Sequence, residues 1–222
     1  MILESIVIVG FALLLDFSVG DPKTKYHPTA WMGKLIASLV PFTKSNSARK
    51  ELLGGILLVS VIVIIVSTLL VVLDVGISLL TIDIVSLIVS IAIGSILLKT
   101  TIAIKGMQKH ALAVVNAVEE GDLDSARNHL SMIVKRDTTN LDKNHILSGV
   151  LESVSENTVD GVTGPLFYYA IFGLPGAFVY RAINTIDSMV GYKTTLFKNV
   201  GWFGAKCDTV LNYAPSRLTG LV

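Results

Sequence analysis

The chain has 222 residues, of which 52% are hydrophobic and only 16% are charged. Soluble domains carry about 25% charged residues, so this composition excludes a disordered chain and argues against an ordinary soluble globule. The 18 basic and 17 acidic residues nearly cancel, which leaves no overall field to attract nucleic acid, and the single cysteine excludes a disulfide framework.

Three apolar stretches in the first half of the chain predict membrane helices. Residues 2–17 are apolar apart from two acids and suit a first span or an interfacial helix. Residues 52–73 contain no charged side chain and match the roughly 20 residues that a spanning helix needs. Residues 77–98 contain a single acid. The short break at 74–76 therefore predicts a tight helical hairpin.

The polar residues 99–161 predict a small layer of helices outside the membrane. Their periodic apolar residues and capping signals set the expected bounds. The expected helices run from Thr100 to Glu120, from a cap at Asp122 through Val134, and from a cap at Asn140 into Glu156.

A fourth apolar stretch, residues 162–183, differs from a plain span. It contains three glycines, two prolines and Arg181. Irregular backbone persists at membrane depth only where protein or water covers it. We therefore expect a broken or re-entrant segment, with a plain span as the alternative.

Charge near the spans predicts the orientation. Basic residues crowd the polar segments on both sides of the hairpin, whereas its tip at 74–76 has none. By the positive-inside rule, the tip should face outward and the polar segments should be cytoplasmic. The chain is thus expected to be one integral membrane domain (1–222), all-α, multispanning, in the inner or plasma membrane of the cell.

The first polar cluster begins where the first apolar stretch ends. Asp16, Asp21 and His27 converge there on a turn that Gly20 and two prolines favour. Two carboxylates and an imidazole can bind a cation or transfer a proton. An ordinary helix exit is the alternative.

A second cluster contains Arg127, Arg136 and Thr138. Planar guanidinium groups suit phosphate or carboxylate, and the hydroxyl adds a donor. The alternative is a solvated helix end, where a basic residue offsets the helix dipole.

A third cluster is acidic. Glu152 and Glu156 are four residues apart on one helix face, where like charges are unfavourable unless a cation joins them. Asn157 and Asp160 can complete an oxygen shell of the kind that magnesium takes. Three solvated acids before a turn are the alternative.

Two further polar helices follow the fourth apolar stretch. Asn184, Asp187 and Ser188, together with the preceding arginine, form one stripe on an otherwise apolar helix. Such a stripe must face protein, water or ligand. The last cluster is another mixed polar helix, which carries Asp208, Asn212 and Arg217.

The order and spacing of these clusters resemble the CbiB/CobD family of cobalamin biosynthesis, adenosylcobinamide-phosphate synthase. The resemblance extends from Asp16 to Leu218. The residues that carry it are Asp16, Gly20-Asp21-Pro22 and His27-Pro28; Ala126-Arg127, Ile133-Val134 and Arg136-Asp137-Thr138; Glu152-Ser153, Glu156-Asn157, Asp160-Gly161 and Pro165-Leu166-Phe167-Tyr168; Asn184-Thr185, Asp187-Ser188-Met189 and Gly191-Tyr192; and Asn212-Tyr213, Pro215 and Arg217-Leu218.

The resemblance implies a membrane enzyme that joins adenosylcobyric acid to (R)-1-aminopropan-2-ol or its O-phosphate, with ATP as co-substrate and Mg²⁺. It supports the clustered positions as a set, and chemistry suggests a role for each. The hypothesised catalytic residues are Asp21, His27, Glu156 and Asp187; the metal group is Glu152, Glu156, Asn157 and Asp160; substrate and phosphate contacts come from Arg127, Arg136, Thr138, Asn184, Ser188, Asn212 and Arg217.

The chain departs from the family pattern in places. Thr163 stands where alanine is usual, and Thr209 replaces an expected second aspartate. Family members usually continue past the end of this chain, which leaves open a homo-oligomer or a partner chain that supplies a C-terminal part. The competing class is a membrane transporter or scaffold for a corrinoid or similar polar ligand, because broken helices with polar stripes also suit a substrate path.

Overall fold

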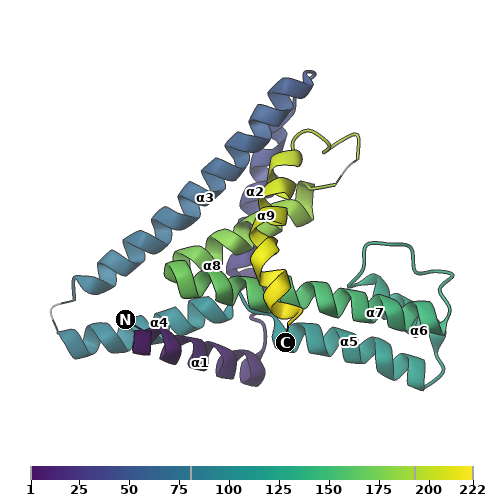
Figure 1. Cartoon of the computed structure of the whole chain (residues 1–222), viewed down its shortest axis with the longest axis horizontal. Helices are drawn as coiled ribbons and strands as arrows, with labels where there is room; N and C mark the ends of the chain where they lie inside the picture. Colours follow the sequence, from purple (N-terminus) through teal and green to yellow (C-terminus); the bar gives the residue numbers. More distant parts are fainter. Residues whose placement is uncertain (1, 81, 193, 222) are drawn as a thin grey trace.

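A computed structural model describes residues 2–80, 82–192 and 194–221, and within these ranges the chain is all-helical with no strand (Figure 1). The expected all-α class is confirmed. The α-helices are α1 (Ile2–Val19), α2 (Pro28–Leu39), α3 (Ala48–Ser78), α4 (Asp83–Lys99), α5 (Ile104–Glu119), α6 (Leu123–Ser131), α7 (Lys143–Thr158), α8 (Gly164–Val190) and α9 (Trp202–Thr219).

Four stretches of the described chain are long and apolar enough to cross a membrane, which confirms a multispanning helical protein. They are Ile2–Val19, Ala48–Ser78, Asp83–Glu119 and Lys143–Val190. Large apolar side chains such as Ile6, Leu57 and Ile88 point outward from α1, α3 and α4. Exposed apolar faces of this kind are expected where lipid is the solvent.

The expected break at 74–76 is wrong. α3 continues through these residues to Ser78, and α4 begins at Asp83. An interior glycine costs a helix only about 1 kcal/mol, too little to end one that is apolar on both sides. The two helices also diverge from their connection (Figure 1), and α4 packs chiefly against α1, where Gly94 makes room for Ile8.

The fourth apolar stretch is broken, as expected. Gly173 has φ +66° and ψ −155°, which interrupts α8, and the chain reverses there. The two halves of α8 pack closely against each other. The ring of Tyr168 in the first half stacks on that of Tyr180 in the second, with centroids 5.4 Å apart. Gly164 lies against the Tyr180 ring, and Gly176 lies against the carbonyl of Tyr168.

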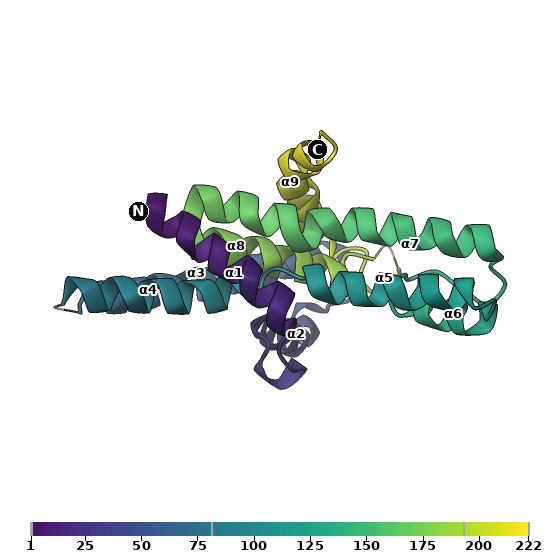
Figure 2. The same cartoon turned by 90° about the horizontal axis from the view of Figure 1, so that it is seen from below.

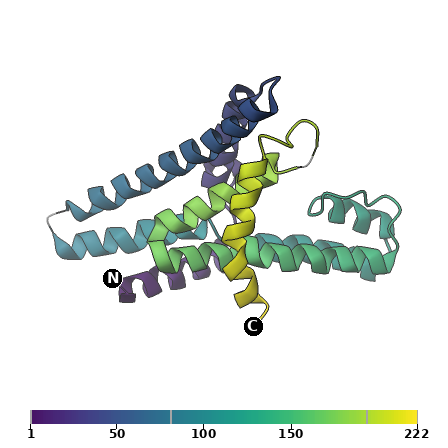
Figure 3. The ribbon, with the colours of Figure 1, turned by 45° about the horizontal axis from the view of Figure 1, so that its top comes forward.

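Helices α5, α6 and α7 form a separate arm with a core of its own, which includes Val114, Leu130 and Ile146. The arm extends away from α3 (Figures 1 and 3), and α5 and α7 lie side by side in it. A second core joins α2, α3, α8 and α9. In Figure 2, α2 and α9 project to opposite sides of the molecule.

The caps of the arm helices differ in part from expectation. Asp122 caps α6, and its carboxylate accepts a hydrogen bond from Ser125 N at 2.9 Å, but α6 ends at Ser131 and not at Val134. The cap of α7 is Asp142 and not Asn140, because its carboxylate accepts from His145 N at 2.9 Å. Both acids are strong N-caps at the positive end of a helix.

Candidate functional site

A polar cavity of about 450 Å³ lies where the arm meets the second half of α8. Its walls come from the turn after α6, from α7 and from α8. It brings together residues of three predicted clusters that are distant in the sequence. The lining residues are Ile133, Val134, Lys135, Arg136, Glu152, Ser153, Glu156, Asn157, Asp160, Arg181, Asn184 and Ser188.

A π-helical turn at Val159–Thr163 places Asp160 in this wall. Such turns insert an extra residue into a helix and are frequent at functional sites. The Asp160 carboxylate accepts hydrogen bonds from Asn184 Nδ2 at 2.9 Å and from Asn212 Nδ2 at 3.1 Å. One acid of α7's extension is therefore held by amides from both α8 and α9.

The same two amides also reach Asp208 on α9. Asn212 Nδ2 donates to Asp208 Oδ2 at 3.0 Å, and Asn184 Nδ2 lies 3.4 Å from Asp208 Oδ1. Two asparagines thus bridge two carboxylates, those of Asp160 and Asp208. Asp208 belongs to the predicted polar cluster of the last helix but was given no site role, although its place four residues before Asn212, on one helix face, is a signal that could have given it one.

Burial, followed by the nearby carboxylates of Asp160 and Asp187, raises the pKa of Asp208 to about 6. The hydrogen bonds from Asn184 and Asn212 oppose this rise but do not cancel it. In an unfolded chain an aspartate has a pKa of about 3.9. Between these values the folded protein holds a proton that the unfolded chain has lost, so stability from this group falls as the pH rises from about 4 through 6.

Replacing Asp208 with asparagine should remove this pH dependence. Wild-type and Asp208→Asn proteins would be melted in detergent and chelator between pH 4 and 8. We expect the melting temperature of the variant, relative to wild type, to rise up to about pH 7 and then to stay level. Altered hydrogen bonding adds only a constant offset, so a difference that does not change with pH would contradict this assignment.

Asp21 lines a second cavity, of about 220 Å³, that adjoins the first. The two cavities share Ile133, Ser153 and Asn157 as lining residues. Gly106 on α5 permits the close approach, because a Cβ there would lie 2.5 Å from Asp21 Oδ2. The predicted gathering of the first and third clusters is therefore visible in the structure.

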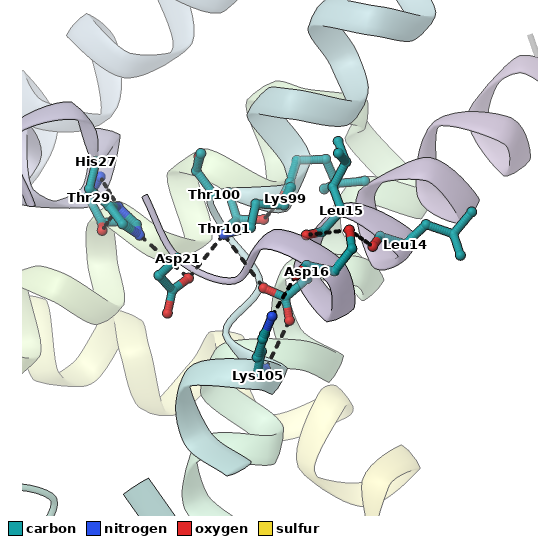
Figure 4. A network of polar contacts seen from close by, with 12 residues as sticks. Leu14, Leu15, Asp16, Asp21, His27, Thr29, Lys99, Thr100, Thr101 and Lys105 are labelled. Carbon is teal, nitrogen blue, oxygen red and sulfur yellow. Dashed lines mark hydrogen bonds and ion pairs between the residues drawn. The ribbon is translucent and has the colours of Figure 1, made fainter. Parts of the chain in front are cut away.

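An ion-pair network fixes the Asp21 carboxylate (Figure 4). Lys99 Nζ lies 3.2 Å from Asp21 Oδ1 and 3.6 Å from Asp16 Oδ1, and the amide of Lys105 donates to Asp16 Oδ2 at 3.0 Å. Lys99 was not predicted, because it ends an apolar stretch and has the form of an ordinary flanking cation. The buried Asp16–Lys99 pair joins the end of α1 to the end of α4, and the Lys105 amide ties Asp16 to the start of α5.

His27 lies beside this network, with Nε2 4.0 Å from Asp21 Oδ1. Its Nδ1 faces the amide and hydroxyl of Thr29, at 3.3 and 2.6 Å, and so caps α2. Burial lowers the pKa of His27, and the Lys99 and Arg181 charges lower it further against the opposing effect of Asp21. The imidazole is therefore neutral at pH 7 and able to accept a proton.

Four predicted contact residues do not line either cavity: Arg127, Thr138, Asn212 and Arg217. Asn212 instead donates hydrogen bonds to Asp160 and Asp208. Arg127 is bound to Asp124 at 2.7 Å and to the carbonyl of Leu141 at 2.9 Å, and Thr138 donates to the Arg127 carbonyl at 3.1 Å. These contacts fold the turn between α6 and α7. Arg217 lies over the Tyr213 ring at 3.5 Å. The expected three-arginine clamp is therefore not assembled, and only Arg136 faces the cavity.

Asp187 is likewise not among the lining residues, although its neighbour Ser188 is. Its side chain packs against Gly191 at the end of α8. It lies close enough to Asp208 for the two carboxylates to interact. Asp187 therefore does not line the cavity, but its charge acts on the nearby Asp208 carboxylate.

The acidic cluster does not form a metal shell of protein ligands alone. Across the described ranges, no three His, Cys, Asp or Glu side chains converge on one point. Glu152 pairs with Arg136 at 3.3 Å, and both oxygens of Asp160 accept amide hydrogens. Glu156 and Asn157 still offer oxygen atoms to the cavity. This donor set fits magnesium, which binds through one or two carboxylates plus substrate phosphates.

Comparisons with known proteins agree with this picture. A family model described as CobD/Cbib protein matches residues 9–222. No solved structure matches the chain. A "Cobalamin biosynthesis protein CobD" of Halalkalibacterium halodurans is 42% identical over 223 residues, which cover 100% of this chain and 67% of that protein.

Two further relatives give the same result. A "Probable cobalamin biosynthesis protein CobD" of Methanocaldococcus jannaschii is 38% identical over 219 residues, covering 97% of this chain and 70% of that protein. The corresponding protein of Clostridium perfringens is 38% identical over 216 residues, covering 96% and 65%. Because the family model matches nearly the whole of this chain and these relatives are similar to it over almost all of its length, the chain belongs to the CobD/CbiB family of cobalamin biosynthesis proteins.

Proposed function

We propose that the protein forms an amide between adenosylcobyric acid and (R)-1-aminopropan-2-ol or its O-phosphate, with ATP as co-substrate. The observation that carries this proposal is the pair of adjoining cavities. One has cations, carboxylates and amides in its wall, and the other has the fixed carboxylate of Asp21. An amide synthetase needs such a division, because it must bind phosphates and an ammonium group side by side.

The chemistry explains why both subsites are needed. A carboxylate is a poor acceptor for an amine, because its oxygen is a poor leaving group. In the proposed reaction a carboxylate oxygen attacks the γ-phosphorus of ATP and ADP leaves. The amine, after losing a proton, then attacks the acyl carbon, and inorganic phosphate leaves. Positioning and charge stabilisation supply most of the rate in such transfers.

Each cavity residue has a proposed role in this reaction. Lys135 and Arg136 face the phosphates, and Glu156 with Asn157 would hold magnesium, which neutralises phosphate charge when bound. Asp21 would receive the ammonium group in its own cavity. His27, kept neutral by its lowered pKa, would accept a proton from that group, directly or through Asp21.

We also propose that the cavities open to the cytoplasm, where ATP is available. The basic residues that flank the helices near the cavities support this orientation, since positive residues favour the cytoplasmic side. The end where α3 and α4 meet would then face outward. Cysteine labelling of a Ser78→Cys variant in intact cells, compared with permeabilised cells, tests this orientation, because an outward residue reacts in both.

Product formation tests the function directly. Purified protein in detergent would be incubated with adenosylcobyric acid, ATP, Mg²⁺ and either amine, and the product would be identified by mass spectrometry. We expect Glu156→Gln to lower turnover about 100-fold or more while the protein stays folded, because the cavity loses a carboxylate that faces the metal and phosphates.

The matched control is Glu119→Gln, because Glu119 is exposed at the end of α5 and faces neither cavity. It should keep wild-type turnover. Equal turnover in Glu156→Gln and wild type would remove the magnesium assignment. Absence of product with both amines, together with corrinoid movement across vesicles, would favour the transporter alternative.

A further inference from the structure

Arg181 lies at the centre of the polar region, on the second half of α8. It lines the 450 Å³ cavity together with Lys135 and Arg136. Its Nη1 donates to the carbonyl oxygen of Asp160 at 3.0 Å and lies 3.4 Å from Asn184 Oδ1. The guanidinium is thus anchored on the π-helical turn that shapes the cavity.

The guanidinium of Arg181 forms no ion pair within the part of the chain that the structure describes. No carboxylate lies within 4.0 Å of it in the described part of the chain, whereas Arg136 pairs with Glu152 and Lys99 pairs with two aspartates. Its Nε is buried and forms no hydrogen bond to any described residue. Its hydrogen bonds are made by Nη1 to neutral oxygens, which leaves most of its five donors unused.

A guanidinium without a direct ion pair is unfavourable in a half-buried position. An arginine does not lose its proton in proteins, so it cannot escape the cost by neutralising. Removal from water is offset only by an opposite charge or by a full set of hydrogen bonds. The carboxylates of Asp160 and Asp21 act on Arg181 only from beyond 4.0 Å, and its hydrogen bonds are incomplete. The missing direct partner is therefore expected to come from a ligand that enters the cavity.

The surrounding charges favour an oxyanion over a neutral group. Lys135 and Arg136 add positive charge to the same wall, and the Glu152 carboxylate is already taken by Arg136. The Arg181 charge also acts on His27, where it helps to lower the pKa of the imidazole. Arg181 therefore lies in the wall of the large cavity and near enough to the Asp21–His27 cluster for its charge to act there.

We propose that Arg181 is a substrate-binding residue that holds an oxyanion, a carboxylate or a phosphoryl group, in the large cavity whose wall it lines. The inference rests on the proposed function and extends it, because it replaces the expected clamp of Arg127 and Arg217 by a single desolvated arginine. A planar guanidinium binds either oxyanion through two parallel hydrogen bonds.

Anion binding can be tested without turnover. Wild-type, Arg181→Gln and Arg181→Lys proteins in detergent would be titrated with sodium pyrophosphate and, separately, with sodium propionate at constant ionic strength, and thermal stabilisation would be measured. We expect at least one anion to stabilise wild type, and its apparent affinity to fall about tenfold or more in Arg181→Gln. Arg181→Lys should fall between them, because it keeps the charge and loses the fork.

The anion that responds identifies the source of the oxyanion: pyrophosphate indicates a phosphoryl group, and propionate indicates the substrate carboxylate. Arg49→Gln is the matched control, since Arg49 is exposed on α3, and it should titrate like wild type. Equal anion affinities in wild type and Arg181→Gln would overturn the inference, as would the absence of stabilisation of wild type by both anions. Arg181-dependent binding without amide formation would reject the proposed reaction only.

Discussion

Replacing Lys99 with methionine is expected to destabilise the protein by about 3–5 kcal/mol, the usual cost of removing one partner of a buried ion pair. Asp16 is 0% exposed, and its Oδ1 forms no hydrogen bond to any described residue. The ammonium of Lys99, at 3.6 Å, is therefore its main compensation. The same ammonium neutralises Asp21, so its loss leaves two carboxylates uncompensated at one junction.

The measurement is unfolding by SDS in mixed micelles, followed by fluorescence of the two tryptophans. Lys109→Met is the matched control, because Lys109 is exposed on α5, and it should change stability by less than about 1 kcal/mol. The double variant Asp16→Asn/Lys99→Met should recover part of the loss, since one buried charge is removed with its partner. Equal stabilities of Lys99→Met and Lys109→Met would exclude a structural role for the pair.

Gly176→Ala is expected to have the second large effect, a loss of roughly 3 kcal/mol, the upper end of what overpacking costs in a close-packed interior. A Cβ at this position would collide with the carbonyl oxygen of Tyr168 and lie 2.7 Å from Phe172 Cβ. A backbone carbonyl cannot move aside by a change of rotamer. The two halves of α8 would have to separate, and the stacked rings of Tyr168 and Tyr180 would part.

The same separation should lower activity, because Tyr180 and Arg181 contact the Asp160 turn from the second half of α8. Thermal melting and product formation would be compared with those of Gly76→Ala, a helix-interior glycine whose added Cβ would meet no atom within 4 Å. That control should be as stable as wild type or slightly more so. If the melting temperatures of Gly176→Ala and Gly76→Ala were equal, the two halves of α8 would tolerate a wider spacing and the prediction would be wrong.

Local sequence signals predicted the elements better than their ends. The glycines and prolines of residues 162–183 predicted an interruption, and Gly173 supplies it with a backbone conformation that glycine adopts readily. The tip of the hairpin was misplaced because Asp74 and Gly76 weaken a helix without ending it. Glycines, prolines and single acids do not specify the direction in which a helix leaves a turn. The divergence of α3 from α4 could therefore not be predicted from the sequence.

The site residues also fall into those that local spacing could predict and those that depend on tertiary packing. Glu152 and Glu156 face one cavity because their spacing on α7 is local, and that part could be predicted. Arg127 and Thr138 instead stabilise the turn between α6 and α7, because Arg127 donates to the carbonyl oxygen of Leu141 and Thr138 donates to that of Arg127. Lys99 was missed because its partners Asp16 and Asp21 lie far from it in the sequence, and only tertiary packing brings them close. The link from Asp208 through Asn184 to Asp160 is tertiary in the same way, whereas its contact with Asn212 is local.

The π-helical turn at Val159–Thr163 makes the number of residues in this segment important for the orientation of the helix that follows it. Each residue of an α-helix rotates the chain by about 100° about the helix axis. The extra residue of the π-helical turn therefore sets which side of the first half of α8 faces a given direction relative to α7. Gly164 meets the Tyr180 ring because of that rotation. Losing a single codon within this turn would aim a different side of the helix at the Tyr180 ring, and no point substitution elsewhere could restore the phase.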